Sequence, residues 1–344
     1  MLAAAPAGVR AAVPVVDRRR APLSLFHRLR PSVRVALMIE GQEGVTWDDW
    51  VALAETCEAN GVEALFRSDH YVSGIDESRP VLDAWATISG LAARTSRLEL
   101  GTLVSPATFR NPAVLARSAA TADEISEGRV TLGLGAGWME REHDAYGLEF
   151  STAGERVARF AEQLEIAHRL FREDRVDHEG RFYRLHDAPG LHRPNLNLLV
   201  GGSALPGTVA PAVRFADEYN TLFATIDEVR ERKGRLDAAC EQAGRDPATL
   251  RYSLMAPCVI GVDDAAVRAS AARIGERFGR DPANVLERYG ERGPVGTPEQ
   301  VVEHLRKIEA IGYDRVMLQH LVHSDLETVE LIGREIAPAL ARGA

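Results

Sequence analysis

The sequence predicts an α/β protein whose single domain is an eight-stranded (β/α)8 TIM barrel. From Val33 onward, short apolar runs alternate eight times with segments of helical periodicity. The runs are continuously apolar, as expected of strands that are covered on both faces. An open doubly wound sheet with a second domain is the competing architecture, but no linker-like change in composition marks a domain boundary. The 344 residues are within the size range of one barrel.

The elements follow one another in a regular order. The predicted strands cover residues 33–39, 63–67, 98–104, 130–134, 196–200, 219–223, 251–260 and 315–318. The predicted helices cover residues 46–60, 80–94, 111–127, 154–171, 211–216, 226–243, 263–290 and 297–311, with a last helix from residue 324. Residues 176–192 resemble an insertion of two short strands, and a loop is expected between the fourth strand and residue 154.

Local signals set several helix starts. Thr46-Trp-Asp-Asp49 and Thr297-Pro-Glu-Gln300 resemble capping boxes, and Asn111-Pro112 supplies a cap with a first-turn proline. Ser324-Asp-Leu-Glu327 is expected to cap the last helix. In the first helix, the apolar face is expected to consist of Trp47, Val51, Ala54 and Cys57.

Composition excludes some classes of protein. The formal net charge of −9 argues against a nucleic-acid partner, because such proteins need a cationic surface. No apolar stretch approaches the roughly 20 residues of a membrane span, so no membrane association is expected. Three scattered cysteines, with no metal-ligand or disulfide spacing, indicate a reducing, cytoplasmic setting: Cys57, Cys240 and Cys258.

The start of the chain differs from the rest. Residues 1–34 contain seven arginines and one acid, Asp17, with no helical or strand period. We therefore expect residues 1–32 to be a disordered or leader segment and residues 33–342 to form the barrel. An organellar import signal is the alternative interpretation of the arginine-rich start.

In TIM barrels the active site lies at the carboxyl ends of the strands. We expect the strand-four end, Ala136-Gly137-Trp138, to reach the same mouth as His70 and Gly202. Gly133-Leu-Gly135-Ala-Gly137 is not a dinucleotide fingerprint, because position 138 is tryptophan; its glycines are expected to let a flat ring approach the backbone. Gly201-Gly202-Ser203, ahead of a helix, is either a phosphate-binding turn or a plain connection.

His70 is the candidate proton donor or acceptor, since histidine titrates near neutral pH. The alternative is that Asp69 and His70 only cap and tie their loop. His143, His320 and His323 are expected to be surface or rim residues. His320 and His323 lack a third ligand at a spacing that would suit a metal, so no metal is expected.

Several stretches of the chain resemble a known family. They are Leu100–Arg117, Ala120–Val130 and Gly133–Gly147, extended by Ser68-Asp69-His70, Val200–Ser203, Gly296–Gln300 and Gly312–Gln319. Together they are similar to the luciferase-like monooxygenase superfamily, and most similar to its branch of coenzyme F420-dependent oxidoreductases. The resemblance covers about residues 33–340.

The resemblance implies a barrel of the bacterial-luciferase-like type, with an insertion region and a cofactor ring over the end of strand three. It implies a non-proline cis peptide at Leu103-Val104 or its neighbour, His70 as the active-site histidine, and a phosphate-contacting turn at strand five. The cofactor-binding residues expected on this basis are Asp69, His70, Leu103, Val104, Ser105, Ala136, Gly137, Trp138, Gly201, Gly202 and Ser203.

The chain also departs from its family. Trp138 stands where the sugar-phosphate dehydrogenases have an acidic glutamate, and Ala136 where bacterial luciferase has an arginine for the flavin phosphate. The turn Ala204–Thr208 lacks the lysine or arginine that many relatives carry. Phosphate binding is therefore expected to depend on backbone amides, Ser203 and Thr208.

The leading hypothesis is an oxidoreductase that transfers hydride between coenzyme F420 and a small organic substrate. The alternatives are a reduced-FMN monooxygenase that uses dioxygen and a non-catalytic flavin-binding relative. Trp138, Met139, Phe223 and Pro257 suggest an uncharged, partly hydrophobic substrate. Homodimers are usual in the superfamily, so a homodimer is expected.

Overall fold

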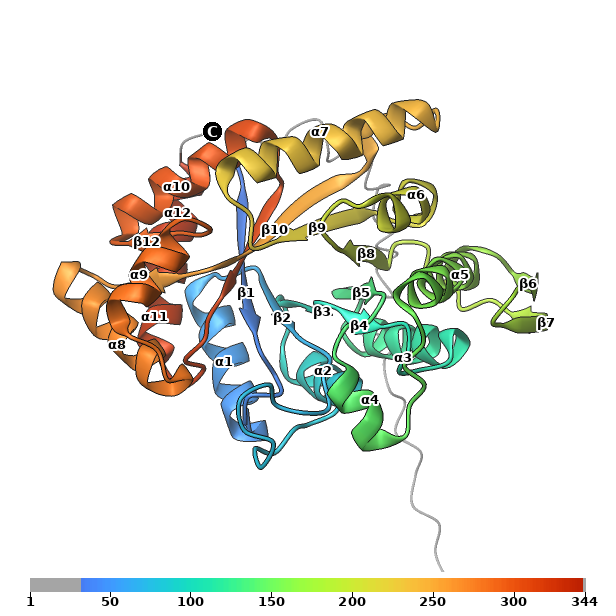
Figure 1. The fold of residues 1–344 in the computed structure, drawn as a ribbon, viewed down its shortest axis with the longest axis horizontal. Coiled ribbons are helices and arrows are strands. Elements are labelled where there is room, and N and C mark those ends of the chain that lie inside the picture. Colours follow the sequence, from blue (N-terminus) through green and yellow to red (C-terminus); the bar gives the residue numbers. More distant parts are fainter. Residues whose placement is uncertain (1–31, 343–344) are drawn as a thin grey trace, which may run out of the picture. The chain divides into compact units, whose positions relative to one another are not determined.

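The computed structural model describes residues 32–342, so the expected leader over residues 1–32 lies almost entirely outside the described part of the chain. Figure 1 shows strands at the centre and helices around them. The eight central strands are β1 (Arg34–Ile39), β2 (Ala64–Arg67), β3 (Glu99–Thr102), β5 (Val130–Gly135), β8 (Asn197–Gly201), β9 (Glu218–Leu222), β10 (Arg251–Pro257) and β13 (Arg315–Gln319).

Every pair of neighbouring central strands is parallel, and the sheet closes on itself. Its order is β3-β2-β1-β13-β10-β9-β8-β5, and β5 pairs back with β3 through Leu100 opposite Val130. The prediction of a (β/α)8 barrel is confirmed. All strands run in one direction, so their carboxyl ends meet at one mouth.

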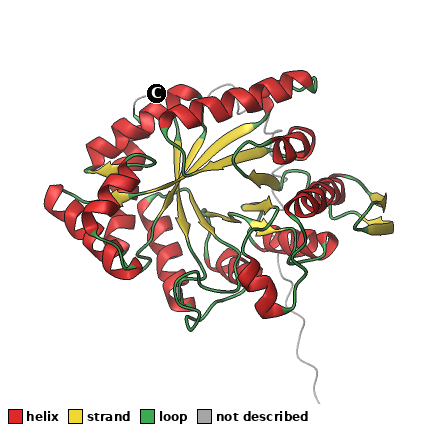
Figure 2. Cartoon of the chain, in the orientation of Figure 1, coloured by secondary structure: helices red, strands yellow, loops and turns green. Residues whose placement is uncertain are grey.

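Helices and short strands complete the described part of the chain (Figure 2). The helices are α1 (Trp47–Asn60), α2 (Ala84–Arg94), α3 (Pro112–Ile125), α4 (Glu140–Tyr146), α5 (Ala153–Arg172), α6 (Pro206–Phe215), α7 (Ile226–Gln242), α8 (Asp264–Phe278), α9 (Pro282–Gly290), α10 (Pro298–Ile311), α11 (Leu326–Leu331) and α12 (Ala337–Ala341), with a π-helical segment at Ile332–Ile336. The short strands are β4 (Ser105–Pro106), β6 (Arg175–Glu179), β7 (Arg184–Pro189), β11 (Val259–Ile260) and β12 (Val295–Gly296). The antiparallel pair β6–β7 confirms the predicted insertion and projects beyond α5 (Figure 1).

Two apolar clusters hold the barrel together. The larger lies between strands and helices, and the smaller fills the barrel interior with Met38, Phe66, Leu199, Met255 and Met317. At the amino ends of the strands, buried Arg315 forms an ion pair with Glu99 and lies close to the buried carboxylate of Glu218. Burial of apolar side chains stabilises both faces of the sheet, while this ionic cluster occupies the end opposite the mouth.

The predicted cap signals produce the expected starts for three helices. Thr46 and Asp49 form a capping box, as do Thr297 and Gln300, and Asn111 caps α3 ahead of a first-turn proline. The N-cap predicted for the last helix was wrong by one residue. Asp325, and not Ser324, accepts the hydrogen bond from the Thr328 amide.

Other predictions were wrong in instructive ways. Trp50 and Leu53 join Ala54 and Cys57 on the buried face of α1, whereas Trp47, the first helical residue, is partly exposed and lies close to Gly90. The stretch expected to be a loop after the fourth strand contains α4. The helix predicted to contain residues 211–216 is α6, which runs from Pro206 to Phe215. No helix within residues 32–342 is both long and apolar enough to cross a membrane.

Candidate active site

The barrel mouth gathers the residues that the sequence pointed to. His70 follows β2, and its ring lies 5.7 Å, centroid to centroid, from the ring of Trp138 beyond β5, with the two planes nearly perpendicular. Gly201 ends β8 next to β5, and a Cβ at Gly201 would meet the Val104 side chain at 2.9 Å. The prediction that these strand ends share one mouth is confirmed.

His70 is held by a carboxylate on α4. Its Nδ1 lies 2.9 Å from Oε1 and 3.1 Å from Oε2 of Glu142, and the Tyr71 amide donates to the same carboxylate at 3.0 Å. The Glu142 side chain is fully buried, whereas His70 keeps 12% of its side chain exposed. Within residues 32–342, Nε2 of His70 makes no hydrogen bond, so this nitrogen is free to face a ligand.

The surroundings of His70 favour its protonated form. Burial disfavours the imidazolium, but the hydrogen bond to Glu142 and the negative charges of Glu142, Glu40 and Asp69 outweigh it and raise the pKa of His70 above 6.5. A carboxylate on Nδ1 also fixes the ring orientation and directs Nε2 away from it. This arrangement suits a group that exchanges one proton near neutral pH.

A second carboxylate at the mouth belongs to Glu40, after β1. Its Oε1 accepts from the side-chain amide of Gln319 at 2.5 Å, and its Oε2 accepts from that of Gln42 at 3.0 Å. Gln42 in turn accepts from the Ser68 hydroxyl, which itself accepts from the Gly41 amide. These bonds tie the ends of β1, β2 and β13 together beside His70.

Asp69 ties the loop after β2 to the turn after β3. Its fully buried carboxylate accepts from the Ser105 hydroxyl at 2.6 Å and from both terminal nitrogens of Arg110, at 2.6 and 3.2 Å. Arg110 also reaches Asp83, the N-cap of α2. Asp69 therefore positions the segment beside His70 through Ser105 and Arg110.

The peptide bond between Leu103 and Val104 is cis, which confirms the position that the family resemblance implied. The neighbouring glycines have a different role from the one expected. A Cβ at Gly133 would lie 2.0 Å from the Thr102 carbonyl oxygen, and one at Gly135 would lie 2.6 Å from the Val104 side chain. These glycines make room for the chain's own Thr102–Val104 segment, and Val104 packs against the ends of β5 and β8.

The turn Gly201-Gly202-Ser203 has fewer free donors than the sequence suggested. The Gly202 amide donates to Asn220 O, and the Ala204 amide donates to the Tyr219 hydroxyl. The Thr208 hydroxyl is 2.7 Å from the same Tyr219 hydroxyl and also bonds to Leu205 O, so it is already engaged. Within the described residues, Ser203 makes no hydrogen bond through its amide or its hydroxyl.

Arg156 supplies a cation that sequence reasoning missed. It donates to the carbonyl oxygens of Gly137 and Ser151 and lies over the Phe150 ring, but no carboxylate among the described residues pairs with it. The next residue, Val157, would be 2.7 Å from a Cβ at Gly207, so the start of α5 packs against the start of α6. Arg156 therefore brings an unneutralised positive charge to the β5–β8 side of the mouth.

Two of the three secondary histidines are buried rather than exposed. His143 bonds to Met139 O and to the Thr108 hydroxyl, both at 2.7 Å, and so braces the turn that carries Trp138. His320 bonds to Asp325 O, and burial lowers its pKa to about 4. His323 lies near Arg277 and Asp49. In the described part of the chain, no three potential ligands gather as a metal site.

Comparison with known proteins gives the family. The sequence model of luciferase-like monooxygenases matches residues 32–315, most of the chain. This chain belongs to the luciferase-like monooxygenase family. One relative is an F420-dependent glucose-6-phosphate dehydrogenase of Kineococcus radiotolerans. It is 33% identical to this luciferase-like chain over 298 residues, and the match covers 79% of this chain and 78% of the relative.

Two further likenesses extend the comparison. A second F420-dependent glucose-6-phosphate dehydrogenase, from Segniliparus rotundus, is 28% identical over 308 residues, covering 82% of this chain and 91% of the relative. Among solved structures, an F420-dependent secondary alcohol dehydrogenase in complex with an F420-acetone adduct has a TM-score of 0.75 at 19% identity, covering 90% of this chain and 99% of that one. The structural likeness supports the luciferase-like barrel fold.

Proposed function

We propose that this luciferase-like protein is a coenzyme F420-dependent oxidoreductase that exchanges hydride with a small organic substrate. The observation that carries the proposal is the His70–Glu142 pair, whose free Nε2 lies at the barrel mouth beside Trp138. The names of the curated relatives support a deazaflavin as the partner of this pair. The bound deazaflavin would supply the hydride acceptor or donor.

The residues at the mouth fit a flat ring with an anionic side chain. Val104 packs against the ends of β5 and β8, and the glycines around it bring no side chain of their own. Arg156 and the free amide and hydroxyl of Ser203 are suitable donors for a phosphate, in a chain whose net charge of −9 gives no general attraction for anions. Leu103, Val104, Ser105, Ala136, Gly137 and Gly202 complete the proposed cofactor surface.

In this mechanism the protein moves one proton. Nε2 of His70 takes the proton of a substrate hydroxyl in the oxidising direction and returns it to the oxygen in the reducing direction. Glu142 holds the ring and stabilises the imidazolium that forms, while Asp69 keeps the loop in place through Ser105 and Arg110. Trp138 lies edge-on to the imidazole and limits the access of water to it.

The cofactor itself can be tested directly. We expect titration of the purified protein to give tight binding of coenzyme F420 and weak binding of FMN, and reduced F420 to be consumed without oxygen uptake. Tight FMN binding with oxygen uptake would instead establish the monooxygenase that the family name denotes. Binding without turnover of any tested alcohol or ketone would favour the non-catalytic relative.

We also propose that the protein is a cytoplasmic homodimer. The three cysteines are all buried and unpaired, as suits a reducing compartment. The dimer follows from the usual state of the superfamily. Sedimentation velocity at micromolar concentration tests it, and a single species with the mass of one chain would contradict it.

A further inference from the structure

Trp138 is the most exposed large aromatic side chain among the described residues, with 69% of its surface accessible. It lies at the working end of the barrel, with its ring beside that of His70. Aromatic rings are among the strongest contributors to binding when a ligand covers them, and large exposed apolar groups at a mouth mark ligand contacts. Its position beside the proton-transfer group places it against the substrate rather than against a distant partner.

Apolar side chains continue from Trp138 along the mouth. Met139 lies 4.0 Å from the Cβ position of Gly74, in the loop after β2, where the neighbouring Ile75 is 44% exposed. Across the barrel, Phe223 and Leu222 at the end of β9 pack against the interior cluster that contains Leu103. Apolar side chains therefore form part of the surface near His70, beside the carboxylates of Glu142 and Glu40.

The charges on this side of the mouth are predominantly negative. The loop after β2 and helix α4 carry seven acids, Asp69, Asp76, Glu77, Asp83, Glu140, Glu142 and Asp144. Their two arginines are already paired, Arg141 with Glu77 and Arg79 with Glu43. Glu40 adds a further carboxylate close to His70. A phosphate bound beside these carboxylates would meet repulsion, and both arginines of the loop and α4 are already paired.

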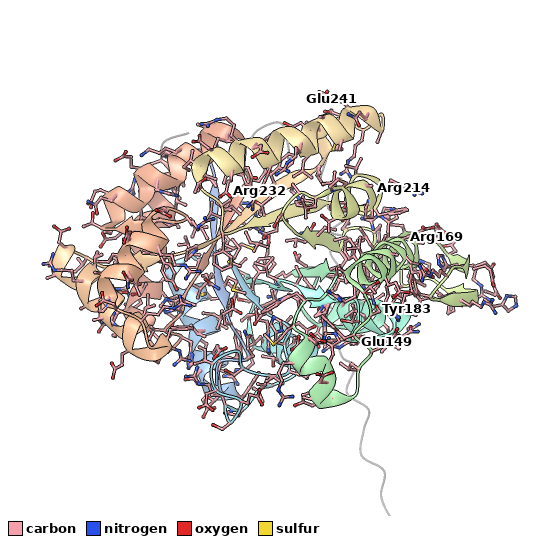
Figure 3. The ribbon with its side chains drawn as sticks, viewed as in Figure 1. Glu149, Arg169, Tyr183, Arg214, Arg232 and Glu241 are labelled. Carbon is pink, nitrogen blue, oxygen red and sulfur yellow. The ribbon has the colours of Figure 1, made fainter. Side chains whose placement is uncertain are left out.

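Cations on the opposite side of the mouth are occupied. Arg232, labelled in Figure 3, donates to Leu222 O, and Arg292 donates to Phe223 O. Both lie close to the same carboxylate, that of Glu228. These arginines hold the loop after β9 in place, and Arg156 belongs to the proposed cofactor surface.

We infer that the substrate is an uncharged, largely apolar alcohol or its ketone, held against Trp138, and that it is not a sugar phosphate. This inference rests on the proposed function. In the oxidising direction the hydroxyl proton passes to Nε2 of His70, the carbinol C–H bond gives up its hydride to the oxidised deazaflavin, and the C=O bond forms. The reverse reaction returns the proton and the hydride to the ketone.

Binding can be measured without turnover. We use 2-octanone as the probe and titrate it into the full chain by calorimetry and by tryptophan fluorescence, with and without F420. We expect 2-octanone to quench the fluorescence of the wild type, and glucose 6-phosphate to leave it unchanged. Trp138→Glu should weaken 2-octanone binding about 10- to 100-fold, and Trp138→Phe should restore most of it. Ile125→Glu, at an exposed apolar site on the last turn of α3, is the matched control and should bind as the wild type does.

The outcomes separate this inference from the proposed function. Tighter binding of glucose 6-phosphate than of 2-octanone, or equal 2-octanone binding by wild type and Trp138→Glu, would overturn the assignment of the substrate. Absence of F420 binding with normal 2-octanone binding at Trp138 would overturn the cofactor proposal and leave the apolar substrate surface in place.

Discussion

His70 has two ring nitrogens in different surroundings: Nδ1 faces the carboxylate of Glu142, and Nε2 has no partner among the described residues. If Nε2 transfers the substrate proton, His70→Asn should lower kcat about 10²- to 10⁴-fold while F420 affinity changes by no more than a few-fold. Steady-state kinetics and F420 titration measure both quantities. His186→Asn, on the exposed β7, is the control and should have wild-type kcat. A kcat loss of less than about threefold in folded His70→Asn would remove the histidine from the mechanism.

Glu142 is 72 residues from His70 in the sequence, and its buried carboxylate is what raises the pKa of His70 against the effect of burial. Glu142→Gln should therefore move the inflection of the pH–rate profile to lower pH. In the oxidising direction the active form is neutral His70, so wild-type rates should rise with pH through an inflection above 6.5. Profiles of wild type, Glu142→Gln and the exposed control Glu140→Gln measure this shift. An unmoved inflection in Glu142→Gln would mean that another group titrates.

The same pair links stability to pH. A folded-state pKa above the unfolded value of 6.5 contributes stability that is fully present below 6.5 and is lost as pH rises through the folded pKa. The difference in unfolding free energy between wild type and Glu142→Gln should therefore be larger at pH 6 than at pH 9. Urea titrations at the two pH values provide the comparison.

Arg156 is the one arginine on its side of the mouth that carbonyl oxygens, rather than carboxylates, hold in place. If it contacts the phosphate, Arg156→Ala should raise the Kd for F420 about 10- to 100-fold, as expected for one charge-assisted hydrogen bond, and should reduce the salt dependence of binding. Arg169→Ala, on the same helix (Figure 3) but paired with Glu173, is the control. Equal affinities of the two variants would locate the phosphate elsewhere.

Among the secondary elements, those with local signals were predictable and those without them were not. The capping boxes at Thr46 and Thr297 each lie within four residues, so the sequence contains the whole interaction. Helix α4 has no apolar period of its own, and tertiary contacts of Glu142 and His143 stabilise it. The match of Gly133–Gly147 to the family was the one signal that could have pointed to Glu142.

The glycines of β5 can be seen in the sequence, but the reason for them cannot. They leave room for residues 102–104, which lie about thirty positions earlier in the chain. Gly133→Ala would place a Cβ 2.0 Å from the Thr102 carbonyl oxygen, which is backbone and cannot turn away. We expect a loss of about 1–3 kcal/mol in unfolding free energy, typical of overpacking. Gly234→Ala, in α7 with open space at its Cβ, should gain about 0.5–1 kcal/mol instead. Chemical denaturation of Gly133→Ala and Gly234→Ala measures both effects. Equal unfolding free energies of the two variants would contradict the crowding at β5.

At the scale of the whole molecule, the two ends of the barrel carry different sets of side chains. The mouth holds the His70–Glu142 pair and the exposed indole of Trp138, and the opposite end holds Arg315 near Glu99 and Glu218. Barrel closure was predictable from eight repeated units, because each unit repeats the same local pattern. The pairing of side chains across the barrel, such as Arg315 with Glu99 over 216 residues, depends on strand stagger, which no local pattern contains.

The buried ionic end should dominate the response of the molecule to acid. Arg315→Met removes the buried cation that Glu99 and Glu218 share and leaves them with Arg34 and Arg251, and it should cost about 3–5 kcal/mol at neutral pH. Burial opposes charge on Glu218, but Arg315 and Arg251 outweigh it and lower its pKa below 4.5, so its contribution is present above pH 4.5 and is lost as pH falls. The difference in unfolding free energy between wild type and Arg315→Met should therefore become smaller in acid. Denaturation at pH 7 and pH 3 measures it, with Lys307→Ala, from an exposed pair with Glu303, as a control that should match the wild type at both.

The side chain of Val104 and any methyl group added at Gly135 or Gly201 would compete for one volume, since the separations would be 2.6 and 2.9 Å. These three positions cannot vary independently during evolution. A descendant that gains alanine at position 135 keeps more of its stability if position 104 has already become smaller, whereas the reverse order passes through a crowded ancestor. The history of this part of the barrel therefore has a favoured direction, in which residue 104 changes first.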